Sequence, residues 1–411
     1  MKLGMIAAHY APEFEGGSER VVRALARGLL ARGHELTVVC GTDRPAGESE
    51  LLRERVDGID VVRIPRRAEE IFDLELARPR VETLVSYALE GCELVHLHHW
   101  STLSQRLVRR LAPRVPVLVT LHDAFATCPR FFRASPLRLV CPPRGEFETC
   151  ARCVEPNARP LTPAELEPRL ARRSSDFEAE IGAAQRWIVP SRFHGERILA
   201  QLTLDRERQV LLAPGLTRSL RPMAAVARDP DGPLRILHFG NLCEEKGTFD
   251  ILKAVALVPE GKLSLTLAGR ALAPGFPALI EQLRGKASVD YLGPYDSRAL
   301  ARAAAQADLA VFPTRVDESY GLVLDEAHAL GLPAWTSDRG AMSERLGPLE
   351  RCLPAADPAA WAEALSREAD MSTGSSTAPA RARFAASVAS VEDSVRAHED
   401  LYLQVLSGVR A

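Results

Sequence analysis

The sequence predicts an α/β protein made of two doubly wound domains, each built around a mostly parallel sheet. At 411 residues the chain is longer than one typical domain. Two series of short apolar runs alternate with amphipathic helical stretches, which is the pattern of βαβ units. Several runs, such as Val117–Leu121, are almost entirely apolar, as expected of strands that are covered on both faces.

The first series predicts an N-terminal domain over residues 1–213. It opens with a strand at Leu3–Ala8 and a helix at Ser18–Arg32, whose apolar residues recur on one side before Gly33 ends it. Further strands are expected at Glu35–Cys40, Asp60–Ile64, Leu94–His98, Val117–Leu121 and Trp187–Val189.

The second series predicts a C-terminal domain over residues 234–385, and residues 214–233, rich in proline and small residues, are expected to be the linker. The polar segment 371–380 is expected to be a mobile loop. Residues 386–411 are expected to end the chain in a helix. The strands of the C-terminal domain are expected to begin at Leu234, Leu263, Val289, Leu309 and Pro333.

Ligands of open α/β sheets bind beyond the carboxyl ends of the strands, so we expect the site in a cleft between the two domains.

Composition narrows the classes of function. Hydrophobic residues make up 46% and charged residues 26%, an ordinary globular mixture. The formal net charge of −2 argues against nucleic acid as a partner. No apolar run is long enough for a transmembrane helix, and the N-terminal apolar stretch is shorter than a signal-peptide core. We therefore expect a cytoplasmic protein, with peripheral contact at the inner face of the membrane left open.

Two glutamates, Glu318 and Glu326, frame the most informative segment of the chain. An apolar strand stops at Pro313 just before them, and a short helix follows them, so Gly321 is expected at a helix start. The free N–H groups of a helix start attract anions. A diphosphate could bind the backbone of Gly321 and Leu322, with one carboxylate on either side to accept hydrogen bonds from sugar hydroxyls. That arrangement suits a nucleotide sugar.

Two other loops of the second domain leave predicted strand ends and carry compatible chemistry. One contains Gly240, Asn241 and Lys246, and its lysine could meet phosphate oxygens. The other contains Gly269 and Arg270. With the glutamate-framed segment, these loops form the expected donor side of the cleft.

The first domain is expected to supply the acceptor side. Gly16 and Gly17 follow the first strand and form a tight turn before a helix. They lack the Gly-x-Gly-x-x-Gly spacing of a dinucleotide site. His122 and Asp123 end an apolar strand, so His122 is expected to project into the cleft, although a structural pair with Asp123 is the alternative. The nearby histidines could instead be buried beside the sheet; they are His96, His98 and His99.

Four of the eight cysteines are concentrated in a proline- and arginine-rich insertion over residues 124–160. Cys128, Cys141, Cys150 and Cys153 have the spacing C-x12-C-x8-C-x2-C, which could provide a tetrahedral thiolate site. The segment has little apolar content to form a core of its own, so we predict a structural zinc ion. Reduced thiols without metal, disulfides and an iron–sulfur cluster remain alternatives.

These motifs resemble one enzyme family. The segment from Glu318 to Glu326 resembles the Glu-x7-Glu motif of the retaining glycosyltransferases of family 4, which have the GT-B fold. The Gly16-Gly17 loop resembles the family's first glycine-rich loop, and a subset of bacterial members has a similar cysteine-bearing insertion after the His-Asp pair. The resemblance extends to Glu344 and therefore covers nearly the whole chain.

One departure from the family concerns charge. The loop of Gly240 resembles the family's Gly-Arg-Leu-x-x-x-Lys-Gly segment, but Asn241 stands where an arginine is usual. An asparagine donates hydrogen bonds without supplying charge. Either Arg270 or Arg315 compensates, or the leaving group is stabilised less strongly.

The resemblance implies a retaining hexosyltransferase. It would move a sugar from a UDP- or GDP-sugar to a hydroxyl of a glycan, glycolipid or small-molecule acceptor, in cell-surface glycan synthesis. The implied roles are Lys246 and the backbone of Gly321 and Leu322 for the diphosphate, and Glu326 for the ribose. Glu318 would contact the donor sugar. His122 would lie near the anomeric centre.

No catalytic metal is implied, since the only Asp-x-Asp sequence of interest, Asp229-Pro-Asp231, falls in the expected linker. Two alternatives remain open. One is a sugar-nucleotide epimerase or a phosphorylase of the same fold. The other is a non-catalytic protein that binds nucleotide sugars, which the missing arginine makes plausible.

Overall fold

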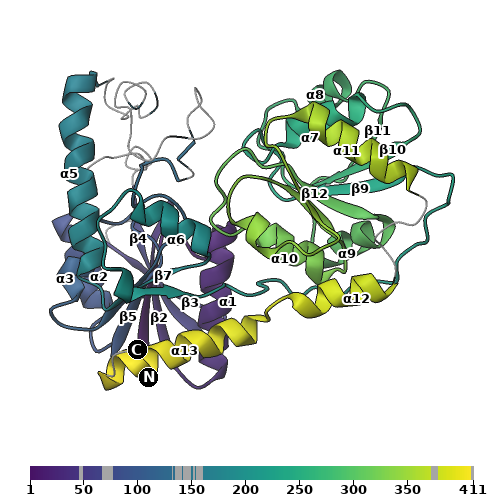
Figure 1. Ribbon diagram of the computed structural model, residues 1–411. Helices are drawn as coiled ribbons and strands as arrows, with labels where there is room; N and C mark the ends of the chain where they lie inside the picture. Colours follow the sequence, from purple (N-terminus) through teal and green to yellow (C-terminus); the bar gives the residue numbers. More distant parts are fainter. Residues whose placement is uncertain are drawn as a thin grey trace. The chain divides into compact units, whose positions relative to one another are not determined.

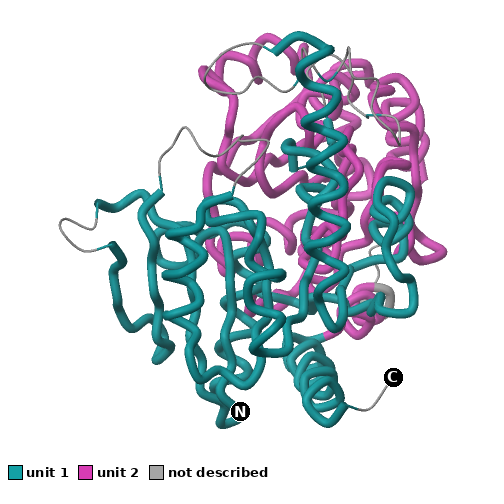
Figure 2. The backbone as a smooth tube through the Cα atoms, turned by 90° about the vertical axis from the view of Figure 1, so that its left-hand side faces the viewer, with its two compact units in different colours: residues 1–217, 390–411 teal, residues 218–389 magenta. Residues whose placement is uncertain are grey.

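The computed structural model describes residues 1–45, 50–66, 77–131, 133–134, 141, 150, 153, 161–371 and 378–408. The chain divides into two compact units. Unit 1 comprises Met1–Thr217 together with Ser390–Ala411, and unit 2 comprises Arg218–Ala389 (Figure 2). No helix within the described residues is long and apolar enough to cross a membrane.

Unit 1 contains an eight-stranded sheet in the described part of the chain, with the order β3-β4-β2-β1-β5-β6-β7-β8. All pairings are parallel except that of β3 with β4. The strands are β1 (Lys2–Ala7), β2 (Glu35–Thr42), β3 (Leu52–Val56), β4 (Ile59–Pro65), β5 (Leu94–Leu97), β6 (Val117–Thr120), β7 (Arg186–Val189) and β8 (Gln209–Leu211).

The helices of unit 1 include the last one of the chain, α13, which returns to this unit from the far end of the sequence (Figures 1 and 2). It packs closely on α1: a Cβ atom built on Gly28 would lie 2.3 Å from the side chain of Val395. Ser394 also donates a hydrogen bond of 2.9 Å to the carbonyl of Ala213. The described helices are α1 (Gly17–Ala31), α2 (Pro79–Ala88), α3 (Leu107–Leu111), α5 (Pro163–Gly182), α6 (Arg192–Leu199), η2 (Arg206–Arg208) and α13 (Val391–Ser407).

Unit 2 contains a six-stranded parallel sheet among its described residues, in the order β11-β10-β9-β12-β13-β14. Its strands are β9 (Leu234–Phe239), β10 (Leu263–Ala268), β11 (Ser288–Tyr291), β12 (Leu309–Phe312), β13 (Ala334–Ser337) and β14 (Arg351–Leu353). Its helices are α7 (Thr248–Ala256), α8 (Phe276–Leu283), α9 (Ser297–Gln306), α10 (Leu322–Ala329), η3 (Ala341–Arg345), α11 (Pro358–Asp370) and α12 (Ala378–Ser387).

Each sheet has a hydrophobic cluster on both of its faces. Consecutive residues of one strand belong to opposite clusters, as Met5 and Ile6 of β1 do in unit 1 and Ile236 and Leu237 of β9 do in unit 2. Alternating side chains of a strand point to opposite faces, so both faces of these strands are covered. The predicted fold class, two doubly wound α/β domains, is confirmed (Figure 1).

The strand order identifies where each sheet changes its winding direction. In unit 1 the order reverses between β1 and β5, and in unit 2 it reverses between β9 and β12. The loops that leave these strands are therefore the default binding loops of an open α/β sheet. They begin near His9 and His98 in unit 1 and near Gly240 and Pro313 in unit 2.

Some local expectations differ from the structure for physical reasons. The short edge strands β3, β8 and β14 have no counterpart among the predicted strands, because they are partly exposed and carry polar residues that hide the apolar signal of a strand. The final helix begins at Val391, where Ser390 and Asp393 form a capping box. Residues 378–387 are helical, although the sequence predicts a loop as far as 380, and residues 372–377 lie outside the described residues.

Candidate functional site

Three loops of unit 2 lie together at the carboxyl edge of its sheet. The backbone N–H of Arg315 donates to the carbonyl of Glu245 over 2.9 Å, and the Thr314 hydroxyl donates to the same oxygen over 3.0 Å. These bonds join the loop after β12 to the loop after β9. A Cβ atom on Gly269 would lie 1.7 Å from the carbonyl oxygen of Gly240, so only glycine allows the loop after β10 to approach this closely.

Lys246 and Glu318 form an ion pair within this cluster of loops. The Lys246 ammonium donates directly to Oε1 of Glu318, and the Thr314 hydroxyl lies 3.5 Å from the same oxygen. The Glu318 side chain is only 10% exposed, whereas the Lys246 side chain is 27% exposed. The pair therefore presents its cation, rather than its anion, to solvent.

A neutral histidine holds the loop that carries Lys246. Burial lowers the pKa of His238 to about 4, so its ring is uncharged near neutral pH. Nδ1 of His238 donates to the Val311 carbonyl over 2.9 Å, which leaves Nε2 to accept a 3.0 Å hydrogen bond from the Thr248 hydroxyl. The Thr248 oxygen in turn accepts from the N–H of Cys243 over 3.1 Å. This chain of bonds fixes the loop to β9 and β12.

The second glutamate lies inside α10, as the sequence predicts. Gly321 precedes the helix with φ 82° and ψ 73°, and Glu326 is 1% exposed. Nε of Arg218 lies 3.0 Å from Oε1 of Glu326, and its guanidinium lies 5.2 Å from the ring centroid of Tyr295. The sequence does not single out Arg218, because it lies within the proline-rich segment expected to be the linker and has no spacing that links it to a distant carboxylate.

Asn241, which stands where the family has an arginine, and the two arginines that could compensate for it differ in their exposure and contacts. Asn241 is exposed on the loop after β9, and Arg270 is exposed after β10. Arg315 is committed to structure: it contacts Asp250 over 2.5 Å and Glu244 over 2.8 Å. Arg315 is therefore not available to replace the missing charge.

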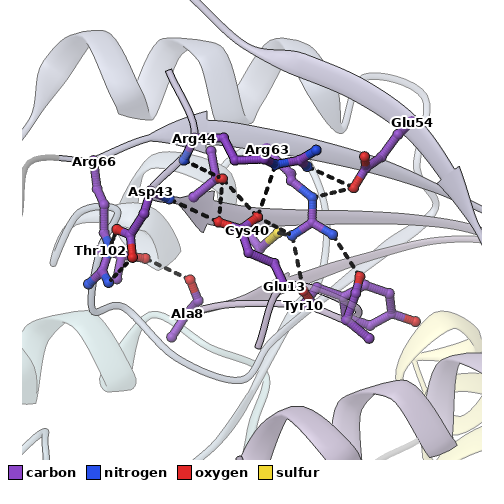
Figure 3. A network of polar contacts seen from close by, with 12 residues as sticks. Ala8, Tyr10, Glu13, Cys40, Asp43, Arg44, Glu54, Arg63, Arg66 and Thr102 are labelled. Carbon is purple, nitrogen blue, oxygen red and sulfur yellow. Dashed lines mark hydrogen bonds and ion pairs between the residues drawn. The ribbon is translucent and has the colours of Figure 1, made fainter. Parts of the chain in front are cut away.

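In unit 1, a buried arginine anchors the loop that follows β1 (Figure 3). Arg63 of β4 is fully buried and donates to the carbonyls of Tyr10 over 3.0 Å and Ala11 over 2.6 Å. Glu13 lies 3.3 Å from the same guanidinium and accepts a 2.6 Å hydrogen bond from the Thr42 hydroxyl. The loop is thereby tied to β2 and β4 before it reaches the predicted glycine pair.

The glycine pair itself stands at the start of α1. Gly16 is the residue that precedes the helix and Gly17 is its first residue. A Cβ atom on Gly16 would lie 2.4 Å from the carboxylate of Glu19, so a side chain there would displace this acidic residue.

His122 is half-buried and contacts a row of buried histidines. Its Nε2 lies 2.9 Å from Nδ1 of His98, and the two rings are stacked. The neighbouring His96 bonds Thr120 over 2.7 Å and the Tyr402 hydroxyl of α13 over 2.6 Å. Burial lowers the pKa of His122 to about 3, with Asp123 opposing the shift. His122 is therefore a neutral hydrogen-bonding group near pH 7.

The close contact of Asp123 is with His99, whereas the sequence suggests the adjacent His122. Its carboxylate lies 3.4 Å from Nε2 of His99 and accepts from the N–H of Phe125 over 2.8 Å. Burial raises the pKa of Asp123, but the charge and hydrogen bond of His99 outweigh that effect and hold it below its usual range.

None of the four clustered cysteines forms a disulfide with another described residue. Burial, together with the thiols of Cys128, Cys141 and Cys153, raises the pKa of Cys150 to about 11. Among the described residues, no group of three or more His, Cys, Asp or Glu side chains is arranged to hold a metal ion. Most of the insertion between these cysteines lies outside the described residues, so the zinc site stays a prediction.

The predicted donor-side residues therefore all come from the loop cluster and α10 of unit 2, and the predicted acceptor-side residues come from unit 1. The unit 2 residues are Gly240, Asn241, Lys246, Gly269, Arg270, Glu318, Gly321, Leu322 and Glu326. The unit 1 residues are Gly16, Gly17 and His122.

Sequence relatives agree with this two-part organisation. Residues 15–219 match Glycosyltransferase Family 4, and residues 233–370 match Glycosyl transferases group 1. Glycogen synthase of Mycobacterium tuberculosis (strain CDC 1551 / Oshkosh) is 24% identical over 379 residues, which is 84% of this chain and 80% of that protein. The phosphatidyl-myo-inositol mannosyltransferase of Mycobacterium leprae is 39% identical over 92 residues, which is 21% of this chain and 25% of that protein.

Solved structures show the same fold. Sucrose-phosphate synthase from Thermosynechococcus elongatus has a TM-score of 0.71 at 20% identity, covering 99% of each chain. HepE of Anabaena, solved in complex with UDP and glucose, has a TM-score of 0.65 at 16% identity, covering 98% of this chain and 100% of HepE. From the two matched regions and this fold, the chain belongs to the GT-B glycosyltransferases, with an N-terminal domain of Glycosyltransferase Family 4 and a C-terminal domain of Glycosyl transferases group 1.

Proposed function

We propose that the protein transfers a hexose, with retention of anomeric configuration, from a UDP- or GDP-sugar to a hydroxyl acceptor. One observation carries the proposal. The Lys246–Glu318 pair lies on loops at the point where the unit 2 sheet reverses, and the buried Glu326 follows within the adjoining helix α10. A cation, a helix start and two carboxylates are the groups that a diphosphate joined to a ribose and a hexose requires.

The proposed chemistry follows from these groups. The bond between the anomeric carbon and the diphosphate oxygen breaks, and Lys246 with the N–H groups of Gly321 and Leu322 stabilises the negative charge on the leaving group. The acceptor oxygen bonds to the same face of the anomeric carbon, and its proton passes to the departing phosphate. Because the acceptor attacks the face that the diphosphate leaves, configuration is retained without a protein nucleophile. Glu326 holds the ribose and Glu318 the hexose hydroxyls. His122 would contribute a neutral hydrogen bond near the anomeric centre.

Solved relatives support a nucleotide-sugar donor. HepE of Anabaena was solved with UDP-glucose, and starch synthase IV of Arabidopsis thaliana was solved with ADP and acarbose. We further propose a glycan or glycolipid acceptor of the bacterial cell surface, with the reaction taking place in the cytoplasm at the inner face of the membrane. The support for this part is the likeness over 92 residues to the phosphatidyl-myo-inositol mannosyltransferase of Mycobacterium leprae.

We also propose that Cys128, Cys141, Cys150 and Cys153 bind one structural zinc ion. The support is their close spacing in a segment too rich in proline and arginine to form a core of its own. Four thiolates complete a tetrahedral zinc shell, so such an ion would stabilise the loop after His122 without an open position for catalysis.

A nucleotide-sugar-binding protein without activity is the second candidate, and the exposed Asn241 in place of a cation is the observation that favours it. The test is to screen a panel of UDP- and GDP-sugars by thermal shift and then measure release of the nucleoside diphosphate with and without membrane glycolipids. Acceptor-dependent release supports transfer. Tight binding without release supports the second candidate, and consumption of the donor without any acceptor supports a sugar-nucleotide epimerase.

A further inference from the structure

An arginine that sequence analysis did not single out lies against the turn between the two glutamates. Arg345 ends η3. One of its terminal nitrogens donates to the Asp325 carboxylate, and the other donates to the carbonyl of Tyr320 and lies 3.3 Å from that of Gly321. Its guanidinium also stacks on the Tyr320 ring at 3.7 Å from the centroid.

These contacts form a closed network. The Tyr320 hydroxyl donates to the second oxygen of Asp325 over 2.7 Å, so one carboxylate accepts from both the phenol and the guanidinium. Asp325 and Tyr320 are 6% and 7% exposed. A planar guanidinium has its donors in a fixed fork, so binding Asp325 on one side determines where the other side points. It points at two successive carbonyl groups.

Holding these carbonyls also fixes the N–H groups that follow them. In a planar trans peptide, the C=O of one residue and the N–H of the next point in opposite directions. With the Tyr320 and Gly321 oxygens turned toward Arg345, the N–H groups of Gly321 and Leu322 point away from it. These are the N–H groups at the start of α10, where helix geometry supplies no partner.

Packing against η3 also restricts the conformation of this turn. Gly321 has φ 82°, a left-handed conformation, and a Cβ atom there would lie 2.4 Å from Met342 of η3. Burying an unsatisfied N–H is unfavourable, and Nε of Arg345 is buried with no hydrogen-bond partner among the described residues. The ion pair with Asp325 and the bonds to the two carbonyls offset that cost, so the arginine also stabilises this turn.

We propose that Arg345 is a positioning residue for the donor: it orients the backbone N–H groups of Gly321 and Leu322 toward the diphosphate. This inference rests on the proposed function. Arg345 acts through the peptide groups, because three of its four terminal N–H groups are directed at Asp325 and the two carbonyls. Its loss should therefore affect the diphosphate part of a ligand and spare the nucleoside part.

The experiment compares Arg345→Met with Arg345→Lys by calorimetric titration of UDP and GDP, and by competition with uridine and guanosine. Methionine keeps much of the apolar stem and removes every donor. We expect affinity for the preferred nucleoside diphosphate to fall about tenfold in Arg345→Met, as for the loss of one to two hydrogen bonds. Affinity for the nucleoside should stay within about twofold. A lysine can donate to Asp325 but not also to both carbonyls, so Arg345→Lys should lose less affinity for the nucleoside diphosphate than Arg345→Met does.

Arg351→Met is the matched control. Arg351 also lies over an aromatic ring, 4.8 Å from the Trp335 centroid, and it is also paired with a carboxylate, 3.1 Å from Glu368. It lies on β14, away from the turn. Its substitution should change the melting temperature without changing affinity for the nucleoside diphosphate.

The outcomes separate this inference from the proposed function. If the wild-type protein binds no nucleoside diphosphate, the proposed donor site itself is wrong. If the wild type binds the nucleoside diphosphate, and both Arg345→Met and Arg345→Lys bind it as tightly as the wild type does, the positioning role is wrong. Equal losses for nucleoside and nucleoside diphosphate would also overturn it, because they would show a general loss of structure. If Arg345→Met does not fold, the Arg345→Lys comparison decides alone.

Discussion

Replacing Lys246 or Glu318 one at a time should have opposite effects on binding of the bare nucleoside diphosphate. In the unliganded protein the lysine is bound to Glu318, which is largely buried. An incoming diphosphate must share that lysine with the carboxylate. Lys246→Ala removes the cation and leaves two anions near each other, whereas Glu318→Gln removes the competing anion and frees the cation.

The magnitudes follow from the type of interaction that each substitution removes. A hydrogen bond to a charged group contributes roughly 1.5–3 kcal/mol, so Lys246→Ala should weaken binding of the nucleoside diphosphate by about 10- to 100-fold. Its turnover should fall by roughly 10²–10³, as for the removal of one preorganised donor to a developing negative charge. Glu318→Gln should bind the nucleoside diphosphate at least as well as wild type and still turn over more slowly, because it holds the hexose less strongly.

Calorimetric titration with the nucleoside diphosphate and a coupled assay for its release measure the two quantities. The control is Lys262→Ala: this lysine pairs with Asp370 over 2.7 Å, but on an exposed surface. It should match wild type in both assays. Equal losses for Lys246→Ala and Lys262→Ala, or weaker nucleoside diphosphate binding in Glu318→Gln than in wild type, would refute the reasoning.

The remaining predictions concern other parts of the molecule. Glu326→Ala should weaken binding of nucleoside diphosphate and nucleotide sugar alike by roughly 1.5–3 kcal/mol, which calorimetry checks. Asn241→Arg should keep or raise the rate of donor cleavage in the release assay, and complete loss would indicate a pocket with another use. The folded-state pKa of His238, about 4, lies below the unfolded value of about 6.5, so the stability from its neutral form is present above pH 6.5 and is lost as pH falls toward 4. Urea titrations between these pH values should show a loss of about 1.4 kcal/mol per pH unit from this histidine, absent in His238→Gln. Elemental analysis should find about one zinc per chain, reduced in Cys150→Ser; metal-free wild type with unchanged folding would remove the zinc proposal.

The sequence predicted the parts of the fold whose signal is local. Strands buried on both faces, such as β1 and β6, are continuous apolar runs and were located within one or two residues. Edge strands such as β3 are partly exposed, and β3 has three consecutive charged residues in the sequence Leu-Arg-Glu-Arg-Val. Its place in the sheet depends on pairing with β4, which the local sequence does not specify. The return of α13 to unit 1 likewise depends on contacts with residues far away in the chain.

The same contrast between local sequence signals and long-range contacts applies to the candidate site. Lys246, Glu318 and Gly321 could be placed near one another because each follows a strand, and the carboxyl ends of parallel strands share one edge of a sheet. The contacts of Arg345 and Arg63 could not be predicted from the sequence. An arginine in a turn or a strand is typical of an exposed, charged position, and only the folded structure identifies its distant partners. Arg63 contacts residues about fifty positions away, and that pairing has no local pattern.

The central claim is retaining transfer from a nucleotide sugar, and proton NMR of the reaction tests it most directly. Wild-type protein would be incubated with UDP- and GDP-hexoses and membrane glycolipids, and the anomeric proton of donor and product would be followed in time. We predict that one donor is consumed only in the presence of acceptor, that its nucleoside diphosphate is released, and that the product keeps the donor's anomeric configuration. A product of inverted configuration, or no donor bound or consumed across the panel, would contradict the account.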